Sequence, residues 1–279
     1  MKTRVGFMQG RLSPQVDGKI QAFPFSCWQG EFASAERNGF SLMEWTLDQN
    51  NLYANPLLTT AGQNEIRKLC KSHGIMISSL TGDCFMQSPF WKTQGAQRDS
   101  LVQDLRSVAT ACHAAGIRMI VVPLVDNGRI ETRAQEDALV EALAKEAHLL
   151  ASLNVRVVFE SDFEPQELAR FMARLDPVRF GINYDIGNSA GLGFDPVKEI
   201  AAYGDRILNV HIKDRILGGT TVPLGTGNAN FDGVFTALAK VGYRGTYILQ
   251  TARAADGNHA EVLCIYRDMA LSWLKRYGA

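Results

Sequence analysis

Four polar side chains of the kinds that bind metal ions stand at the ends of short apolar segments in the second half of the chain. Glu160 follows Val-Val-Phe, Asp185 follows Ile-Asn-Tyr, His211 follows Asn-Val, and Gln250 follows Tyr-Ile-Leu. Two carboxylates can balance the charge of a divalent cation, while an imidazole and a carboxamide oxygen complete the protein ligands. We interpret these residues as one metal site. Its oxygen-rich ligands favour manganese or magnesium, with zinc or cobalt as alternatives.

Each of these residues alone has a simpler interpretation. A Glu or Asp at a strand end commonly caps a helix or pairs with a cation, and a buried histidine commonly completes hydrogen bonds in the core. His211 differs from the other histidines, which fall in or at the ends of expected helices: His73, His113, His148 and His259. The occurrence of all four side chains at successive strand ends is what favours a metal site.

These residues belong to a longer pattern, in which a short apolar segment, a polar loop and an amphipathic segment repeat along the whole chain. The expected strands are Val5–Gln9, Ser41–Trp45, Ile75–Leu80, Ile117–Val122, Arg156–Glu160, Phe180–Asp185, Ile207–Ile212 and Thr246–Gln250. Eight such units with right-handed crossovers predict an α/β fold, a single (β/α)8 TIM barrel spanning 1–279 as one domain. An open doubly wound sheet is the competing fold, but residues 10–14 lack its glycine-rich phosphate turn. In a barrel the strand ends meet at one mouth, so the four candidate ligands would converge there.

Helix boundaries carry signals of their own. The cap pairs are Ser26 with Gln29, Thr60 with Gln63, Thr132 with Gln135 and Asn258 with Glu261, and Asp195-Pro196 fits a cap followed by proline. Expected helix ends, where glycine follows a helical segment, are Asn38-Gly39, His73-Gly74, Ala115-Gly116 and Val241-Gly242.

Composition excludes several classes of function. The 29 basic residues equal the 29 acidic ones, which argues against a nucleic-acid partner. No stretch is apolar for long enough to cross a membrane or act as a signal peptide, so we expect a cytoplasmic protein without a membrane partner. The five scattered cysteines form no CxxC pair, which argues against a disulfide framework or a thiolate zinc site. The sequence leaves the oligomeric state open, a homo-oligomer included.

Several motifs resemble those of the xylose isomerase-like TIM barrel superfamily, the sugar phosphate isomerase/epimerase family. They are Gly6-Phe7-Met8-Gln9-Gly10-Arg11-Leu12, Asn183-Tyr184-Asp185-Ile186-Gly187-Asn188, His211-Ile212-Lys213-Asp214-Arg215 and Pro223-Leu224-Gly225-Thr226-Gly227. The superfamily includes sugar phosphate isomerases and epimerases, ketose 3-epimerases, inosose dehydratases and endonuclease IV. The resemblance implies a metal-dependent isomerase or epimerase that removes a proton next to a ketose carbonyl through an enediolate, with a small sugar or sugar phosphate as its partner.

The resemblance also implies roles for individual residues. In the epimerases Glu, Asp, His and Glu from strands 5 to 8 hold the metal, which corresponds by position to Glu160, Asp185, His211 and Gln250. Gln250 departs from this pattern, and a carboxamide cannot shuttle a proton near neutral pH. Asn188 replaces a histidine that binds substrate in the family.

We expect Glu160 to act as both metal ligand and base. A second acid would come from Glu44, Asp83, Lys213 or Asp214, of which we favour Glu44 and Lys213 as catalytic. The expected substrate-binding residues are Asn188, Arg215, Asp214 and Asp83. Buried ion pairs are the simpler interpretation of Glu44 and of the Lys213–Arg215 cations.

Other interpretations stay open. The same metal and enolate would serve a lyase that dehydrates a keto-polyol, as an inosose dehydratase does. A barrel that binds sugar without turnover would explain the missing second Glu. The glycine-rich stretch 218–227 could bind a phosphate through backbone N–H groups or be an ordinary loop. An endonuclease would need a multinuclear, histidine-rich cluster, and only His211 is suitably placed.

Overall fold

Eight parallel strands pair side by side until the last meets the first, within residues 4–278, which the computed structural model describes. The barrel order is β1-β10-β7-β6-β5-β4-β3-β2. The strands are β1 (Val5–Met8), β2 (Leu42–Thr46), β3 (Met76–Thr81), β4 (Met119–Leu124), β5 (Arg156–Ser161), β6 (Phe180–Asp185), β7 (Ile207–Ile212) and β10 (Thr246–Leu249). The predicted (β/α)8 barrel is confirmed, and each expected strand exists with small shifts at its ends.

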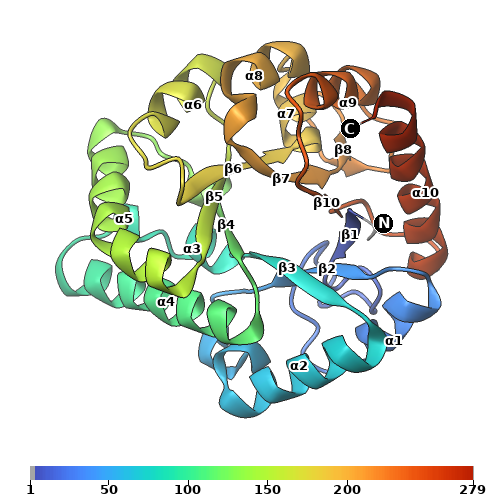
Figure 1. The fold of residues 1–279 in the computed structure, drawn as a ribbon, viewed down its shortest axis with the longest axis horizontal. Helices are drawn as coiled ribbons and strands as arrows, with labels where there is room; N and C mark the ends of the chain where they lie inside the picture. Colours follow the sequence, from blue (N-terminus) through green and yellow to red (C-terminus); the bar gives the residue numbers. More distant parts are fainter. Residues whose placement is uncertain (1–3, 279) are drawn as a thin grey trace.

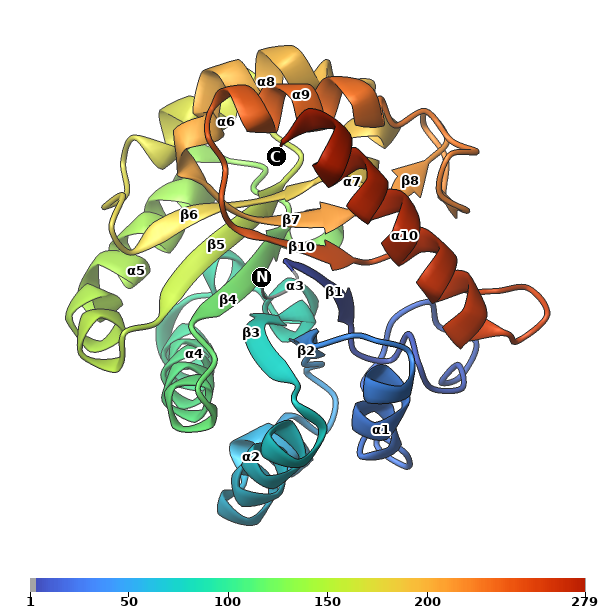
Figure 2. The same cartoon turned by 45° about the vertical axis from the view of Figure 1, so that its right-hand side comes forward.

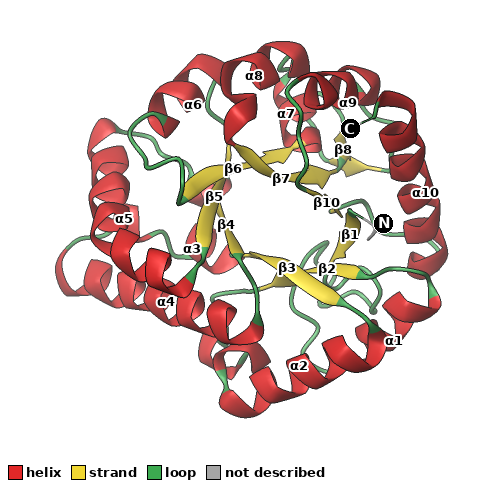
Figure 3. Ribbon diagram, in the orientation of Figure 1, coloured by secondary structure: helices red, strands yellow, loops and turns green. Residues whose placement is uncertain are grey.

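Helices surround this ring of strands on all sides (Figure 1; Figure 3). The α-helices are α1 (Gly30–Arg37), α2 (Thr60–His73), α3 (Asp83–Gln87), α4 (Gly95–Ala115), α5 (Arg133–Leu153), α6 (Pro165–Met172), α7 (Ile186–Leu192), α8 (Pro196–Tyr203), α9 (Phe231–Lys240) and α10 (His259–Tyr277). Short 3-10 helices are η1 (Leu52–Ala54), η2 (Pro56–Leu58), η3 (Phe90–Lys92), η4 (Asp126–Gly128) and η5 (Gly204–Arg206). None of the described helices is both long and apolar enough to span a bilayer.

The main apolar core lies between strands and helices. Phe7, Phe159 and Tyr247 are fully buried members of it, contributed by three different strands. Neighbouring residues on a strand point to opposite faces, so Met8, next to Phe7, belongs to a separate small cluster with Leu42 and Ile248. The barrel interior therefore has its own packing, distinct from the layer under the helices.

Most of the predicted helix boundaries hold. Thr132 and Asp195 accept hydrogen bonds at the starts of α5 and α8, and the glycines after α2, α4 and α9 have positive φ, as expected. The α2 cap is Thr59 in place of Thr60. The Ser26 prediction was wrong, because α1 begins at Gly30 after a series of turns. Asn258 precedes α10 but makes no side-chain cap bond.

Three further elements sit directly after strand ends. Helix α3 follows β3, helix α7 follows β6, and after β7 the chain forms a two-stranded antiparallel sheet of β8 (Asp214–Arg215) and β9 (Thr221–Val222). Figure 2 shows the strand arrows of β7 and β10 pointing to the side of the molecule that carries β8. These elements bring Asp83, Asn188 and Arg215 to the mouth formed by the carboxyl ends of the strands.

Candidate metal centre

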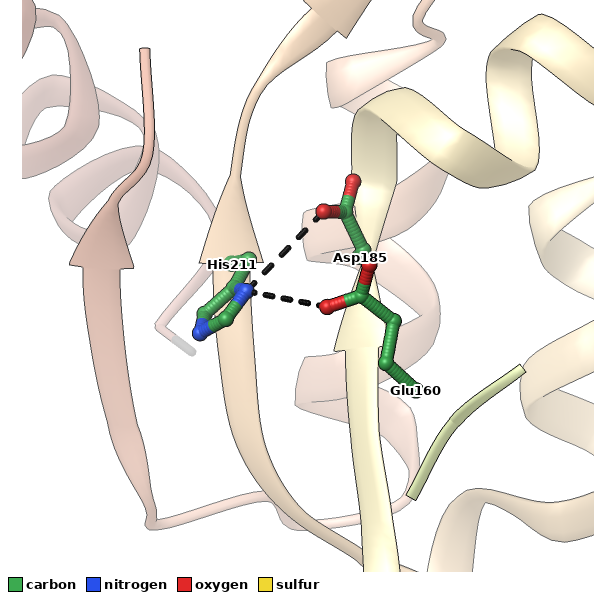
Figure 4. A group of neighbouring side chains, drawn as sticks. All are labelled: Glu160, Asp185 and His211. Carbon is green, nitrogen blue, oxygen red and sulfur yellow. Dashed lines mark ion pairs between the residues drawn. The ribbon is translucent and has the colours of Figure 1, made fainter. Parts of the chain in front are cut away.

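Three of the four expected ligands meet at the mouth of the barrel. Glu160 from β5, Asp185 from β6 and His211 from β7 are buried, and each offers one ligand atom within 4.8 Å of the others. His211 Nδ1 is 3.3 Å from Glu160 Oε2 and 3.9 Å from Asp185 Oδ2. Figure 4 shows both carboxylates on the same side of the imidazole ring, facing this nitrogen. One nitrogen and two oxygens thus point to one place.

Strand register explains why these side chains converge. Asp185 pairs directly with His211 across β6 and β7, and two residues earlier Asn183 pairs with Asn209. Residues two apart on a strand share a face, so the asparagines form a polar layer directly beneath the ligands. Asn183 Nδ2 lies 3.1 Å from both Glu160 Oε2 and His211 Nδ1. This layer fixes the orientation of the ligand side chains from inside the barrel.

His211 is held at both of its ring nitrogens. Nε2 lies 2.7 Å from Glu44 Oε1, and Nδ1 faces the two candidate carboxylate ligands. Burial by itself lowers the pKa of His211, but the charges of Glu44 and Glu160 outweigh it and raise the pKa to about 10. Without a metal the ring therefore carries a second proton, which a cation at Nδ1 would displace.

Glu44 does not reach the mouth, where we expected it to act as a catalytic acid. Its carboxylate is fully buried below His211 and accepts hydrogen bonds from Ser79 Oγ at 2.6 Å and Asn209 Nδ2 at 2.9 Å. Strand β2 continues to Thr46, so Glu44 stands two residues short of the strand end. We assign Glu44 the alternative role weighed from the sequence, a buried partner that holds the histidine.

Gln250 is connected to the candidate ligands through Lys213. Lys213 Nζ donates to Asp185 Oδ2 at 2.9 Å and to Gln250 Oε1 at 3.2 Å. The Gln250 backbone N–H bonds to Ile212 just beyond the pairing of β10 with β7. The Lys213 ammonium group therefore bridges Asp185 and the Gln250 oxygen.

On the other side, Gln250 connects to Asp83. Its Nε2 donates to Gln21 Oε1 at 3.0 Å, and Gln21 Nε2 donates to Asp83 Oδ2 at 2.6 Å. Burial raises the pKa of Asp83 to about 7, and the charges of Asp48 and Glu160 add to this effect. Asp83 is thus a nearly buried acid whose pKa is close to neutral pH.

Asn188 links the metal group to a second cation. Its Nδ2 donates to Glu160 Oε1 at 2.5 Å, while its Oδ1 accepts from Arg215 Nη1 at 3.0 Å. The backbone N–H of Asn188 also donates a cap bond to Asp185 Oδ1 at 2.7 Å as α7 begins. The short helix therefore positions Asn188 against Glu160.

A cavity of about 370 Å³ opens above these groups, within the roughly 300–1,000 Å³ typical of small-molecule sites. Its lining is mostly polar and includes Asp83, Glu160, Asn188, Lys213, Arg215, Gln21 and Gln250. Such a surface suits a small ligand with many hydroxyl groups.

Asp214 binds backbone N–H groups of the glycine-rich stretch, whereas we expected it to contact substrate. It is 1% exposed, and its carboxylate accepts N–H bonds from Gly225 at 2.9 Å, Gly227 at 2.9 Å and Ala229 at 3.0 Å. A Cβ on Gly227 would lie 2.2 Å from the carboxylate, so only glycine fits. These N–H groups of the glycine-rich stretch serve Asp214, which removes them from phosphate binding.

The donor atoms fit a hard divalent cation. Glu160 and Asp185 offer oxygens and His211 offers Nδ1, a combination that suits manganese or magnesium. The second nitrogen of the histidine is bonded to a carboxylate, an arrangement common in metal sites.

Sequence reasoning missed Gln21, Asn183 and Asn209. The asparagines had a usable signal, because each stands two residues before a candidate ligand on the same strand face. Gln21 lies in the loop after β1, where no periodicity marks which side chain points inward.

Known proteins resemble this chain over much of its length. A family model described as xylose isomerase-like TIM barrel matches residues 32–275. L-ribulose-5-phosphate 3-epimerase of Shigella flexneri is 24% identical over 258 residues, covering 89% of each chain. Inosose dehydratase of Geobacillus kaustophilus is 26% identical over 168 residues, which span 52% of this chain and about half, 54%, of that protein.

The fold likeness extends to solved structures. The crystal structure of D-psicose 3-epimerase with D-tagatose, from Clostridium cellulolyticum H10, superposes with a TM-score of 0.72 at 14% identity, covering 99% of both chains. The family model and the closed barrel agree with one another. This chain belongs to the xylose isomerase-like TIM barrel family.

Proposed function

We propose that this protein is a divalent-metal-dependent sugar isomerase or epimerase that removes the proton next to a ketose carbonyl. One observation carries the proposal: Glu160 lines the polar cavity and also belongs to the buried group with Asp185 and His211. A carboxylate so placed can touch a bound sugar and a cation together. The relatives that act on ribulose phosphate and inosose support the substrate class.

Glu160, Asp185, His211 and Gln250 would hold the ion. A bound divalent cation supplies the Lewis acidity that polarises a carbonyl and its neighbouring hydroxyl, which lowers the cost of forming an enediolate. The chain itself supplies the base. Glu160 accepts the proton from the carbon next to the carbonyl, while the amides of Asn183 and Asn188 hold its carboxylate in one orientation.

The cavity lining positions the sugar. Lys213 and Arg215 stand on the same strand extension as His211 and donate hydrogen bonds at the cavity wall. The amides of Gln21 and Asn188 present further groups to hydroxyls. These contacts select a polyol and hold its reactive carbon near Glu160.

Exchange of hydrogen with heavy water tests this function. Incubation with D-tagatose, D-allulose, D-fructose and L-ribulose in deuterium oxide should place deuterium at the carbon next to the carbonyl, read by NMR. The label should depend on added manganese or magnesium and disappear with a chelator. Full metal occupancy with no label in any sugar of a broad ketose panel contradicts the proposal.

A dehydratase is the second candidate, favoured by the similarity to inosose dehydratase. The same base and enolate would then expel a hydroxyl group from the adjacent carbon. Mass spectrometry separates the two activities, since the lyase product is lighter by one water while the isomer keeps its mass.

Binding without turnover is the third candidate, motivated by the carboxamide at Gln250. It predicts that metal and sugar bind, as calorimetry would show, while deuterium never enters the sugar. The exchange experiment therefore separates binding without turnover from the two enzymatic functions, and mass spectrometry separates those two.

A further inference from the structure

The cavity wall across from the ligand strands carries a carboxyl group that the metal centre leaves unused. Asp83 is the first residue of α3, directly after β3, and lines the cavity together with Glu160. It is 8% exposed, so water reaches it only from the cavity. Its position gives the cavity two carboxyl groups, one on β5 and one at the start of α3.

A directed series of hydrogen bonds ties Asp83 to Gln250 at the end of β10. Lys213 donates to Gln250 Oε1, Gln250 Nε2 donates to Gln21, and Gln21 Nε2 donates to Asp83 Oδ2. Each donor in the series faces an acceptor, which fixes the orientation of both amides. One glutamine side chain therefore separates the Asp83 carboxyl group from the end of β10.

Asp83 keeps one oxygen available for substrate. Gln21 occupies Oδ2, and among residues 4–278 no group donates a hydrogen bond to Oδ1. Oδ1 is also absent from the buried atoms that lack a partner, which agrees with its access to the cavity. A sugar hydroxyl or a C–H next to a carbonyl can approach this oxygen.

The other acids near the mouth are engaged elsewhere. Glu44 is buried under His211, and Asp214 binds the backbone of the glycine-rich loop. Asp126 also lines the cavity, but it is exposed to solvent. Gln250 has no basicity to contribute. Asp83 is the enclosed carboxyl group that remains.

We propose that Asp83 is the second proton-transfer residue of this protein, acting on the face of the substrate opposite Glu160. This inference rests on the proposed function. Asp83 thereby supplies the carboxyl group that Gln250 lacks at the end of β10, and inversion at one carbon becomes feasible in this chain.

The proton balance is simple. Ionised Glu160 takes the proton from the carbon next to the carbonyl, and the electron pair of the broken C–H bond enters the enediolate. Protonated Asp83 then donates its proton to the other face of the same carbon, forming the new C–H bond. The enzyme ends with Glu160 protonated and Asp83 ionised, and exchange with water restores the starting state.

The acidity of Asp83 suits this cycle. Burial raises its pKa to about 7, so both protonation states are populated near neutral pH. General acids and bases work best when their pKa lies close to the working pH.

The test measures two rates on the same metal-loaded protein: deuterium entry and inversion of configuration, both read by NMR on the ketose panel. In Asp83→Asn we expect the ratio of inversion to exchange to fall by about 100-fold or more, because Glu160 still removes and returns a proton on one face. Calorimetry should show that the variant still binds metal and sugar. A variant with merely damaged structure would lose both rates together and keep the wild-type ratio.

Two further variants complete the design. Asp162→Asn removes a nearby carboxylate that pairs with Arg129 outside the cavity lining, and it should keep the wild-type ratio. Adding Gln250→Glu to Asp83→Asn should restore inversion, because a carboxyl group returns to the end of β10.

Three results overturn the inference: an unchanged ratio in Asp83→Asn, a double variant in which inversion is not restored, or a wild-type protein that exchanges but never inverts. Absence of wild-type exchange with every sugar would instead refute the proposed function, and this inference with it.

Discussion

The two walls of the barrel mouth are built in different ways. On the wall formed by β5, β6 and β7, Glu160, Asp185 and His211 project from strands, and paired registers align them. On the opposite wall, Gln21 and Asp83 come from a loop and a short helix, joined by hydrogen bonds to Gln250. The first wall collects the candidate ligands of the proposed cation. The second holds amides and one acid of near-neutral pKa.

This contrast separates two tasks. Metal ligands must keep fixed distances, which strands inside a closed barrel provide. Groups that contact a sugar can stand on loops, which vary without disturbing the barrel. The end of β10 carries the carboxamide of Gln250, while the acid Asp83 stands at the start of α3.

The largest expected effect concerns the ligand wall. Glu160→Gln should lower deuterium exchange by about 1,000-fold, because a carboxamide cannot accept the proton although its oxygen can still coordinate. Metal content, measured on the purified variant by elemental analysis, should stay near the wild-type value. Exchange within about tenfold of wild type would remove Glu160 from the role of base.

A change beneath the ligands should have an intermediate effect. Glu44→Gln weakens the carboxylate that holds His211 Nε2, so metal affinity should fall by about 10- to 100-fold. Titration with manganese, followed by electron paramagnetic resonance, measures it. Ser79→Ala is the matched control, because it removes only one hydrogen bond to the other Glu44 oxygen and should change the affinity far less. Equal effects in both variants would mean that Glu44 does not act through the histidine.

Asp83, the acid of the second wall, should make the free energy of unfolding depend on pH. The pKa of Asp83 is raised from 3.8 to about 7, so its contribution to stability is full below pH 3.8 and is lost as pH rises through 7. The asparagine in Asp83→Asn stays neutral at every pH. The free energy of unfolding of the metal-free variant should therefore rise by about 2 kcal/mol relative to that of the wild type as the pH goes from 5 to 7.

Urea unfolding at several pH values, with a chelator present, measures this difference. A constant difference between the two proteins across that range would show that the Asp83 carboxyl is not shifted toward neutral pH.

The smallest expected effect concerns phosphate on the substrate. Lys213 and Arg215 already donate to Asp185, Gln250, Asn188 and Gly219, and the cavity also carries acids. L-ribulose should therefore bind more tightly than L-ribulose 5-phosphate, by about five- to tenfold, the size expected for ~1 kcal/mol of charge repulsion near water. Calorimetry with both sugars measures it. Tighter binding of the phosphate would show that one of these cations leaves its internal partner.

Periodicity and strand-end position were enough to predict the ligand wall. Each of Glu160, Asp185 and His211 ends or nearly ends an apolar segment, and closure of the barrel alone brings such ends together. Glu44 shows the limit of this rule. The pairing of β2 with β3 shifts register between Met43 and Glu44, and β2 extends to Thr46, which leaves Glu44 one layer below the mouth. No sequence pattern indicates such a shift of strand register.

The second wall could be predicted only in part. Asp83 was a candidate because it follows a strand, but Gln21 was not, since a loop position depends on contacts with distant segments. Arg253 shows this dependence, because it donates to the backbone of Ile20, 233 positions away, and holds the loop next to Gln21. Contacts between residues more than 200 positions apart leave no local pattern.

The carboxylate of Asp214 anchors three N–H groups at the base of the glycine-rich loop, and Asp214 itself directly follows the strand segment that carries His211 and Lys213. The base of this loop is thereby fastened to the ligand strand, whereas Leu217 and Gly218, near its tip, are exposed. Thr220 and Thr221, next to the tip, line the cavity, so substitutions at these two positions change the cavity wall while the base of the loop stays fastened.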